Sequence, residues 1–224
     1  MKAHDGARRL NGPQTTGREL RNLSQPEFDI NLSTDQDVVV RDGTVLRADV
    51  YTPATHAKVP ALLAVSCYPR QIQNSGAPLG FVEAGASDFW VSRGYGHVIA
   101  NTRGTGGSAG TYSWLDETER HDVADLVEWV ATQEWCDGNV GMIGISYFAM
   151  TQLAGAIERP DHLKAIFPVA TTGDVFEAAW HNGLLSSTFI SAWIAGVATL
   201  AGRSDHAFRN VAVDVASRLL RTRV

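Results

Sequence analysis

The sequence predicts an α/β fold in which helices cover both faces of a mostly parallel sheet. Three observations support it: apolar runs alternating with helical patterns between residues 59 and 170, two alternating segments before them, and a glycine-flanked serine at the end of one run. Continuous apolar runs are typical of strands covered on both faces, and strand–helix alternation is typical of parallel sheets. The 224 residues suffice for one domain and part of a second.

The chain divides into three predicted parts. Residues 1–26 are polar and lack periodicity, so we expect a disordered arm. Residues 27–173 hold the α/β core. Residues 174–224 show helical patterns over 175–180, 184–200 and 204–220, and we expect them to form a helical cap in which Gly183 and Gly202 separate the helices.

Two antiparallel strands are predicted to open the core. Apolar and polar side chains alternate from Phe28 to Leu32 and again from Thr44 to Tyr51, and a valine run, 38–40, lies between these segments. Asp42-Gly43 follows that run and is a strong signal for a two-residue hairpin turn.

The remaining core elements follow from apolar runs and from helical spacing. Buried strands are predicted over Val59–Ser66, His97–Ala100, Val140–Ile145 and Leu163–Ala170. Helices are predicted over Phe81–Ser92, Glu117–Thr132 and Phe148–Glu158. The second of these helices has acidic residues in its first turn, where they stabilise the helix dipole.

The segment Gly141–Ala149 organises this prediction. A strand enters Ser146 and a helix leaves it, with Gly144 two residues before the serine and Ala149 three residues after it. A strand, a serine and a helix with small residues around the serine form the nucleophile elbow of an α/β-hydrolase. A serine that only caps the helix is the alternative interpretation. The strand–helix context favours Ser146 as a nucleophile.

Two groups are candidates for an oxyanion hole. One is the backbone N–H of Tyr147, the residue after the nucleophile. The other is Tyr68, which follows the first buried strand and whose hydroxyl can donate a hydrogen bond. From its position alone, Tyr68 is equally well explained as an ordinary aromatic residue at a strand end.

A catalytic base is harder to find. None of the seven histidines follows a late strand, which is where the order Ser, Asp, His of α/β-hydrolases places the base. Asp205 and His206 are adjacent, but neighbouring residues on a helix do not face each other, so we expect a solvated pair.

Composition excludes other classes of function. The formal charge of −5, with scattered Lys and Arg, gives no indication of nucleic-acid binding, and no apolar run is long enough to span a membrane. Cys67 and Cys136 lie in apolar segments, which suggests reduced, buried thiols in a cytoplasmic protein. The loop Arg103–Gly110 lacks the Lys-Ser/Thr end of a P-loop, so we expect a structural turn and no cofactor.

The segment Trp135–Tyr147, which ends in Gly-Ile-Ser-Tyr, closely resembles the cocaine esterase / X-Pro dipeptidyl-peptidase family of serine hydrolases. Three other segments also resemble this family: Cys67-Tyr68-Pro69, the loop 101–110 and Leu163–Pro168. The resemblance covers residues 35 to 200. It implies Ser146 as nucleophile, with the Tyr68 hydroxyl and the Tyr147 amide as oxyanion hole. It also implies an acyl pocket under the cap, with Trp180 and Trp193 as substrate-binding aromatics.

The chain departs from the family pattern at three points. Ala149 replaces the last glycine of the elbow, and Asn101 replaces an aspartate, which we expect to cost a structural hydrogen bond. The family's last sheet strands, catalytic Asp and His have no counterpart here, so we expect a truncated enzyme, weakly active or inactive alone. The expected substrate is a small ester, amide or peptide; the alternative is an inactive fragment, or half of a split hydrolase that binds a complementing chain or its own copies.

Overall fold

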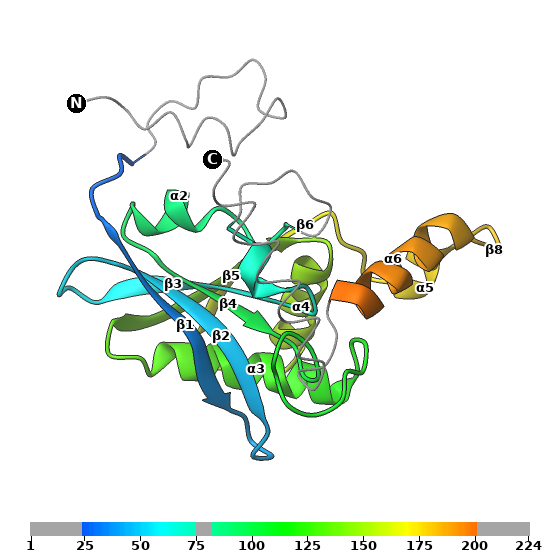
Figure 1. The fold of residues 1–224 in the computed structure, drawn as a ribbon, viewed down its shortest axis with the longest axis horizontal. Helices are drawn as coiled ribbons and strands as arrows, with labels where there is room; N and C mark the ends of the chain where they lie inside the picture. Colours follow the sequence, from blue (N-terminus) through cyan, green and yellow to red (C-terminus); the bar gives the residue numbers. More distant parts are fainter. Residues whose placement is uncertain (1–23, 75–81, 201–224) are drawn as a thin grey trace.

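The computed structural model describes residues 24–74 and 82–200. The predicted arm lies almost wholly outside these residues, as do the helix predicted over 204–220 and the Asp205–His206 pair. The described chain forms a six-stranded sheet with helices around it (Figure 1). Its strands are β1 (Ile30–Val39), β2 (Val45–Pro53), β3 (Val59–Ser66), β4 (Gly96–Asn101), β5 (Cys136–Ile145) and β6 (Leu163–Val169).

The strand order confirms the predicted fold class. The sheet runs β1-β2-β4-β3-β5-β6, with antiparallel pairing among the first three strands and parallel pairing from β4 to β6. The predicted hairpin joins β1 to β2 through a turn at Gly43, whose φ is 84°. Because β3 and β5 are parallel neighbours, their carboxyl ends meet at one edge of the sheet. That edge carries both Tyr68 and Ser146.

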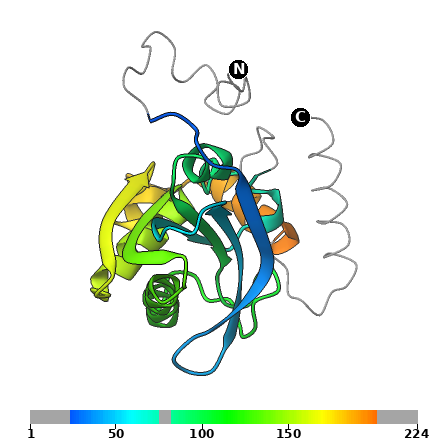
Figure 2. The same cartoon turned by 90° about the vertical axis from the view of Figure 1, so that its left-hand side faces the viewer.

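Helices cover the two faces of this sheet. The helical elements are η2 (Arg70–Ile72), α2 (Ser87–Val91), α3 (Glu117–Ala131), α4 (Tyr147–Ile157), α5 (Val175–Ala179) and α6 (Ser187–Leu200). Figure 2 shows α2 (teal) and α3 (green) on opposite sides of the strands. Alternate residues of β3 enter separate apolar clusters: Leu63 and Val65 pack with α3, whereas Ala64 packs with Tyr68 and Phe148. The sheet therefore has a core on each face.

Helix α2 is shorter than predicted. We predicted a helix over Phe81–Ser92, but among the described residues α2 occupies only Ser87–Val91. The backbone N–H groups of Glu83 and Ala84 donate instead to the Gln73 side chain, and Gly85 has a φ of 100°. A positive φ is incompatible with a right-handed helix, so the segment before Ser87 is a loop tied to η2.

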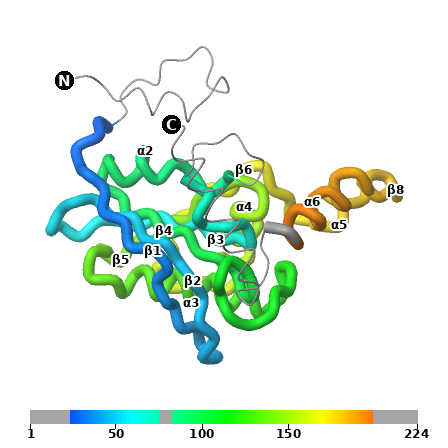
Figure 3. The backbone as a smooth tube through the Cα atoms, viewed as in Figure 1, coloured from blue at the N-terminus to red at the C-terminus, as the bar shows by residue number. Residues whose placement is uncertain are grey.

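The segment that we predicted to form a helical cap contains a strand pair that we did not predict. After α5, β7 (Trp180–His181) pairs with β8 (Leu184–Leu185), and α6 follows. The predicted helical pattern over 175–180 and 184–200 was therefore wrong at Trp180 and at Leu184–Leu185. Asn182 and Gly183 have φ values of 51° and 82°, and Asn-Gly is the preferred turn of a two-residue hairpin. Figure 3 shows α5, β8 and the start of α6 extending away from the sheet.

Within the described ranges, no helix combines the length and the apolar character needed to cross a bilayer. Cys67 and Cys136 are both buried free thiols, as predicted.

Candidate active site

Ser146 has the backbone conformation of a strained turn. Its φ and ψ are 59° and −118°, values that a non-glycine residue rarely adopts. It stands between β5 and α4, and its side chain makes no capping hydrogen bond to the helix. The capping interpretation of Ser146 therefore does not hold. Strain of this kind persists only where the surrounding structure imposes it, and it concentrates at functional sites.

Close packing around Ser146 imposes the turn. Gly144 has a φ of 132°, and a Cβ at this position would lie 2.3 Å from the Cβ of Phe148. The N–H of Ile145 donates to Glu83 O (3.0 Å), and that of Ser146 donates to Val169 O (3.0 Å). Ala149 is fully buried, so the methyl group that replaces the family's glycine fits without opening the elbow.

Tyr68 follows β3 and lies against the elbow. Its ring packs edge-on against Tyr147 and Phe148, with centroid distances of 6.0 Å in both pairs. Burial raises the pKa of its hydroxyl, while hydrogen bonds with Trp193 and Ser146 act in the opposite direction. Because the pKa is raised, the phenol keeps its proton at neutral pH and remains a hydrogen-bond donor beside Ser146.

Asn101 fixes the backbone of Tyr68. Its Nδ2 donates to the carbonyl oxygens of Tyr68 (2.8 Å) and Ser66 (3.3 Å), and its Oδ1 accepts from Arg70 (3.1 Å). We expected the replacement of aspartate by Asn101 to cost a hydrogen bond, and this was wrong. An ionised aspartate has no donor for the two carbonyl groups, whereas the amide supplies one.

Tyr147 is the first residue of α4. Its backbone N–H has no partner within the helix and lies at the positive end of the helix dipole, beside Ser146. Its side chain is buried, and the hydroxyl donates to both carboxyl oxygens of Glu119, at 2.7 and 2.9 Å. Tyr112 in turn donates to the Tyr147 hydroxyl (3.1 Å). The backbone N–H that is the candidate donor therefore belongs to Tyr147, whose side chain is fixed at its hydroxyl by Glu119.

Glu119 is the buried anchor of this network. It is 3% exposed and also accepts from the N–H of Leu115 (2.6 Å), ahead of the Asp116 cap of α3. Burial raises the pKa of its carboxyl from 4.5 to about 7, and the hydrogen bonds from Tyr147 and Leu115 only partly offset this. The folded protein therefore binds a proton at Glu119 more tightly than the unfolded chain does.

This raised pKa predicts a pH-dependent effect of Glu119→Gln. Because the folded pKa is raised, the stability associated with the protonated carboxyl is present below pH 4.5 and is lost as pH rises through about 7. The variant carries no such titration. We would measure urea denaturation of both proteins at pH 5 and pH 8. Relative to the wild type, the free energy of unfolding of the variant should rise by about 2.5 kcal/mol between these two pH values. If the difference in free energy of unfolding between the two proteins were the same at both pH values, the raised pKa of Glu119 would be contradicted.

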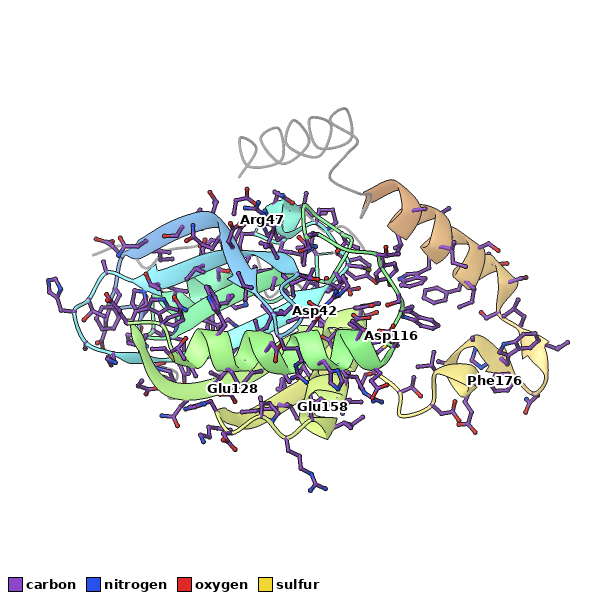
Figure 4. The ribbon with its side chains drawn as sticks, turned by 90° about the horizontal axis from the view of Figure 1, so that it is seen from below. Asp42, Arg47, Asp116, Glu128, Glu158 and Phe176 are labelled. Atoms are coloured by element: carbon purple, nitrogen blue, oxygen red, sulfur yellow. The ribbon has the colours of Figure 1, made fainter. Side chains whose placement is uncertain are left out.

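The histidines with described partners are engaged elsewhere. His97 is buried and its Nδ1 shares a hydrogen bond with Ser87 (2.7 Å), His121 lies 3.5 Å from Glu158, and His162 lies 2.6 Å from Glu128. Figure 4 shows that Glu128 and Asp116 lie toward different ends of α3, and that the Asp116 end is the one nearer to α6. Among residues 24–74 and 82–200, no hydrogen bond between a histidine and Ser146 is seen.

The two tryptophans predicted to bind substrate have different surroundings. Trp193 of α6 donates from its indole N–H to the Tyr68 hydroxyl (2.8 Å) and stacks on Tyr147, with a centroid distance of 6.3 Å. Trp180 is 39% exposed and stacks on Phe176, 5.7 Å away. Figure 4 shows Phe176 in the outer part of the cap. The structure thus brings Trp193 to Tyr68 and Tyr147, but places Trp180 with Phe176.

The loop 102–110 is held by the protein itself. Arg103 forms ion pairs with Asp42 and Asp122 (both 2.7 Å), and the Ser108 hydroxyl donates to the Asn101 carbonyl (3.0 Å). Gly106 also accepts a hydrogen bond from buried Arg70. These contacts agree with the predicted structural turn.

Two carboxyl groups near the elbow were not identified from the sequence. Glu119 was interpreted only as an acidic residue in the first turn of a helix. Glu83 accepts the N–H of Ile145 through its carbonyl, and burial raises the pKa of its side chain to about 7. The spacing Asp116-x-x-Glu119 is a capping-box pattern, which accounts for the helix start but gives no signal of the contact with Tyr147.

Comparison with known proteins gives the same family that the motifs suggest. The family model for X-Pro dipeptidyl-peptidase (S15 family) matches residues 42–221. Cocaine esterase from Rhodococcus sp. (strain MB1 Bresler) is 36% identical over 186 residues, covering 79% of this chain and 31% of the relative. A putative Xaa-Pro dipeptidyl-peptidase from Bacillus anthracis is 28% identical over 204 residues, covering 74% and 34%. The chain thus spans about a third of the length of these relatives.

A solved structure of a CocE/NonD family hydrolase from Staphylococcus aureus has the same arrangement. It superposes with a TM-score of 0.66 at 26% identity, covering 84% of this chain and 39% of that one. The fold is therefore that of α/β-hydrolases, as predicted. With most of its length matched by the family model, the chain belongs to the X-Pro dipeptidyl-peptidase (S15) family of hydrolases.

Proposed function

We propose that this chain carries the nucleophile and the oxyanion hole of a serine hydrolase that cleaves small esters or amides through an acyl-Ser146 intermediate. The observation that carries the proposal is the strained conformation of Ser146, whose side chain makes no capping hydrogen bond to the helix, beside the Tyr68 hydroxyl and the Tyr147 amide. A nucleophile between two donors is the arrangement that acyl transfer requires.

The reaction proceeds in two stages. The Ser146 oxygen bonds to the substrate carbonyl carbon as its proton passes to a base, and the carbonyl electron pair moves to oxygen. The Tyr68 O–H and the Tyr147 N–H donate to this oxyanion. When it collapses, the bond to the leaving group breaks, the leaving group takes the proton, and acyl-Ser146 remains. Water then attacks the acyl group by the same steps and frees Ser146.

The proposal has two forms, which differ in where the catalytic base for Ser146 comes from. In the first form, the chain acts alone and is weakly active, because no histidine among the described residues is hydrogen-bonded to Ser146. In the second, it is one half of a split hydrolase, and a complementing chain or another copy brings the acid and base to Ser146. The edge strand β6 supports the second form, since Phe167 on it is 70% exposed.

The names of the relatives suggest two substrate classes, esters and peptides with proline at the second position. We favour esters for the chain alone, because an activated ester needs less help from an acid and a base than an amide does. The two buried free thiols, Cys67 and Cys136, support a reducing, cytoplasmic location.

The proposal is tested by comparing p-nitrophenyl acetate with an Ala-Pro-p-nitroanilide. We expect one equivalent of p-nitrophenol in an initial burst, followed by slow turnover, and no measurable release from the anilide. Faster release from the anilide would overturn the ester assignment. Release from neither substrate would overturn the first form of the proposal. The second form predicts that this chain then gains esterase activity when a complementing segment of a longer relative is mixed with it. If the mixture is also inactive, the second form is overturned.

A further inference from the structure

Trp193 contacts both tyrosines of the proposed oxyanion hole. Its Nε1–H donates to the Tyr68 hydroxyl oxygen at 2.8 Å, and its ring lies nearly parallel to that of Tyr147, with an interplanar angle of 15°. Val197, one turn further along α6, is 7% exposed and packs in the same apolar cluster as Tyr68 and Tyr147. The face of α6 that carries Trp193 and Val197 is therefore the face that contacts the elbow.

The hydrogen bond from Trp193 constrains the Tyr68 hydroxyl. A phenol has one proton to donate and can also accept, whereas an indole N–H can only donate. Because Tyr68 accepts from Trp193, the proton of its own hydroxyl must point to a different acceptor. Ser146 also lies close enough to this hydroxyl to influence its pKa. A hydroxyl that accepts a hydrogen bond is also a stronger donor, because the two bonds polarise each other.

We propose that Trp193 is a positioning residue of the oxyanion hole. Its indole N–H holds the Tyr68 hydroxyl with the proton directed to the place that the substrate oxyanion occupies, so contact of α6 with the elbow completes the hole. This inference rests on the proposed roles of Ser146 and Tyr68. It adds a role to the one that the resemblance implied for Trp193, and it links α6 to the reaction.

The surroundings of Trp193 suit a residue with a fixed position. The ring of Trp114, from the loop before α3, lies 5.7 Å from the Trp193 ring between centroids, at an interplanar angle of 48°. Tyr147 also stacks on the Trp193 ring, and its hydroxyl is hydrogen-bonded to Glu119. Phe189 and Ile194 of the same helix are 62% and 55% exposed. Trp193 is thus held between Trp114 and the buried Tyr147, while other apolar side chains of α6 are left in solvent.

Trp193→Phe tests this role because it keeps an aromatic ring beside Tyr147 and removes the indole N–H donor. We expect the rate constant for acylation of Ser146 to fall about 10-fold, which corresponds to the loss of one hydrogen bond. The fall should be equal for p-nitrophenyl acetate and p-nitrophenyl benzoate, and the half-saturating ester concentration should not change. An acylation rate constant within about twofold of the wild-type value would overturn the proposal.

An NMR measurement tests the contact without relying on activity. The indole N–H signals of ¹⁵N-labelled protein are recorded, and the Trp193 signal is assigned by its disappearance in Trp193→Phe. Tyr68→Phe removes the acceptor and should shift this signal upfield, whereas the control Trp90→Phe, on α2, should leave it in place. An unmoved signal in Tyr68→Phe would refute the inference. If the wild-type serine proves unreactive, the proposed function fails, and the NMR result still decides whether Trp193 holds Tyr68.

Discussion

Replacing Ser146 by alanine is expected to abolish the burst of p-nitrophenol and to reduce ester cleavage to the rate in buffer. The hydroxyl is the group that becomes acylated, and neither the Tyr68 hydroxyl nor the Tyr147 amide can replace it. The change is small in volume. Ser146 makes no capping bond, and alanine adds no atom to the turn, so we expect the variant to fold normally.

Stopped-flow absorbance measures this loss, and urea denaturation verifies that the variant is folded. Ser113→Ala, in the loop before α3, is the matched control and should retain the full burst. If Ser146→Ala kept the burst amplitude of the wild type, another side chain would be the acyl acceptor, and the interpretation of the elbow would be wrong.

Tyr68→Phe is expected to lower the acylation rate constant by about 10²–10³-fold, the usual cost of removing one donor from an oxyanion hole. The ring remains packed against Tyr147 and Phe148, so only the hydroxyl is lost. The hydrogen bond to Trp193 is lost with it. Because the Tyr147 amide is unchanged, we expect some acylation to remain, in contrast to Ser146→Ala.

The control for this variant is Tyr95→Phe, which removes a hydroxyl from a tyrosine that packs on Trp90. It should acylate at the wild-type rate. A loss of less than about threefold in Tyr68→Phe would show that Tyr68 is an ordinary aromatic residue at a strand end, which is the alternative that its position in the sequence left open.

Much of the core could be predicted from the sequence, because its signals are local. Strand β3 has the predicted bounds of Val59–Ser66, since a continuous apolar run is typical of a strand covered on both faces. The hairpin at Gly43 follows from Asp-Gly, and the strand–serine–helix order at Ser146 follows from its neighbours. Parallel pairing then brings Tyr68 near Ser146 without further information.

The remaining features depend on contacts between distant segments. Glu119 and Tyr147 are 28 positions apart, and Trp193 and Tyr68 are 125 apart, so no periodicity could connect them. Asn101 was judged by its departure from the family and not by the two carbonyl groups that it contacts. The β7–β8 hairpin did carry a local signal, Asn182-Gly183, but the apolar residues around it also suited a helix.

The central claim is that Ser146 is an activated nucleophile beside an oxyanion hole. Reaction with a fluorophosphonate at pH 8.5, followed by intact-mass and peptide analysis, tests it most directly. We expect one adduct per chain, located on Ser146, formed much more slowly in Tyr68→Phe and absent from Ser146→Ala. An adduct on a different residue, or an unmodified wild-type chain under conditions that label a known serine esterase, would contradict the claim.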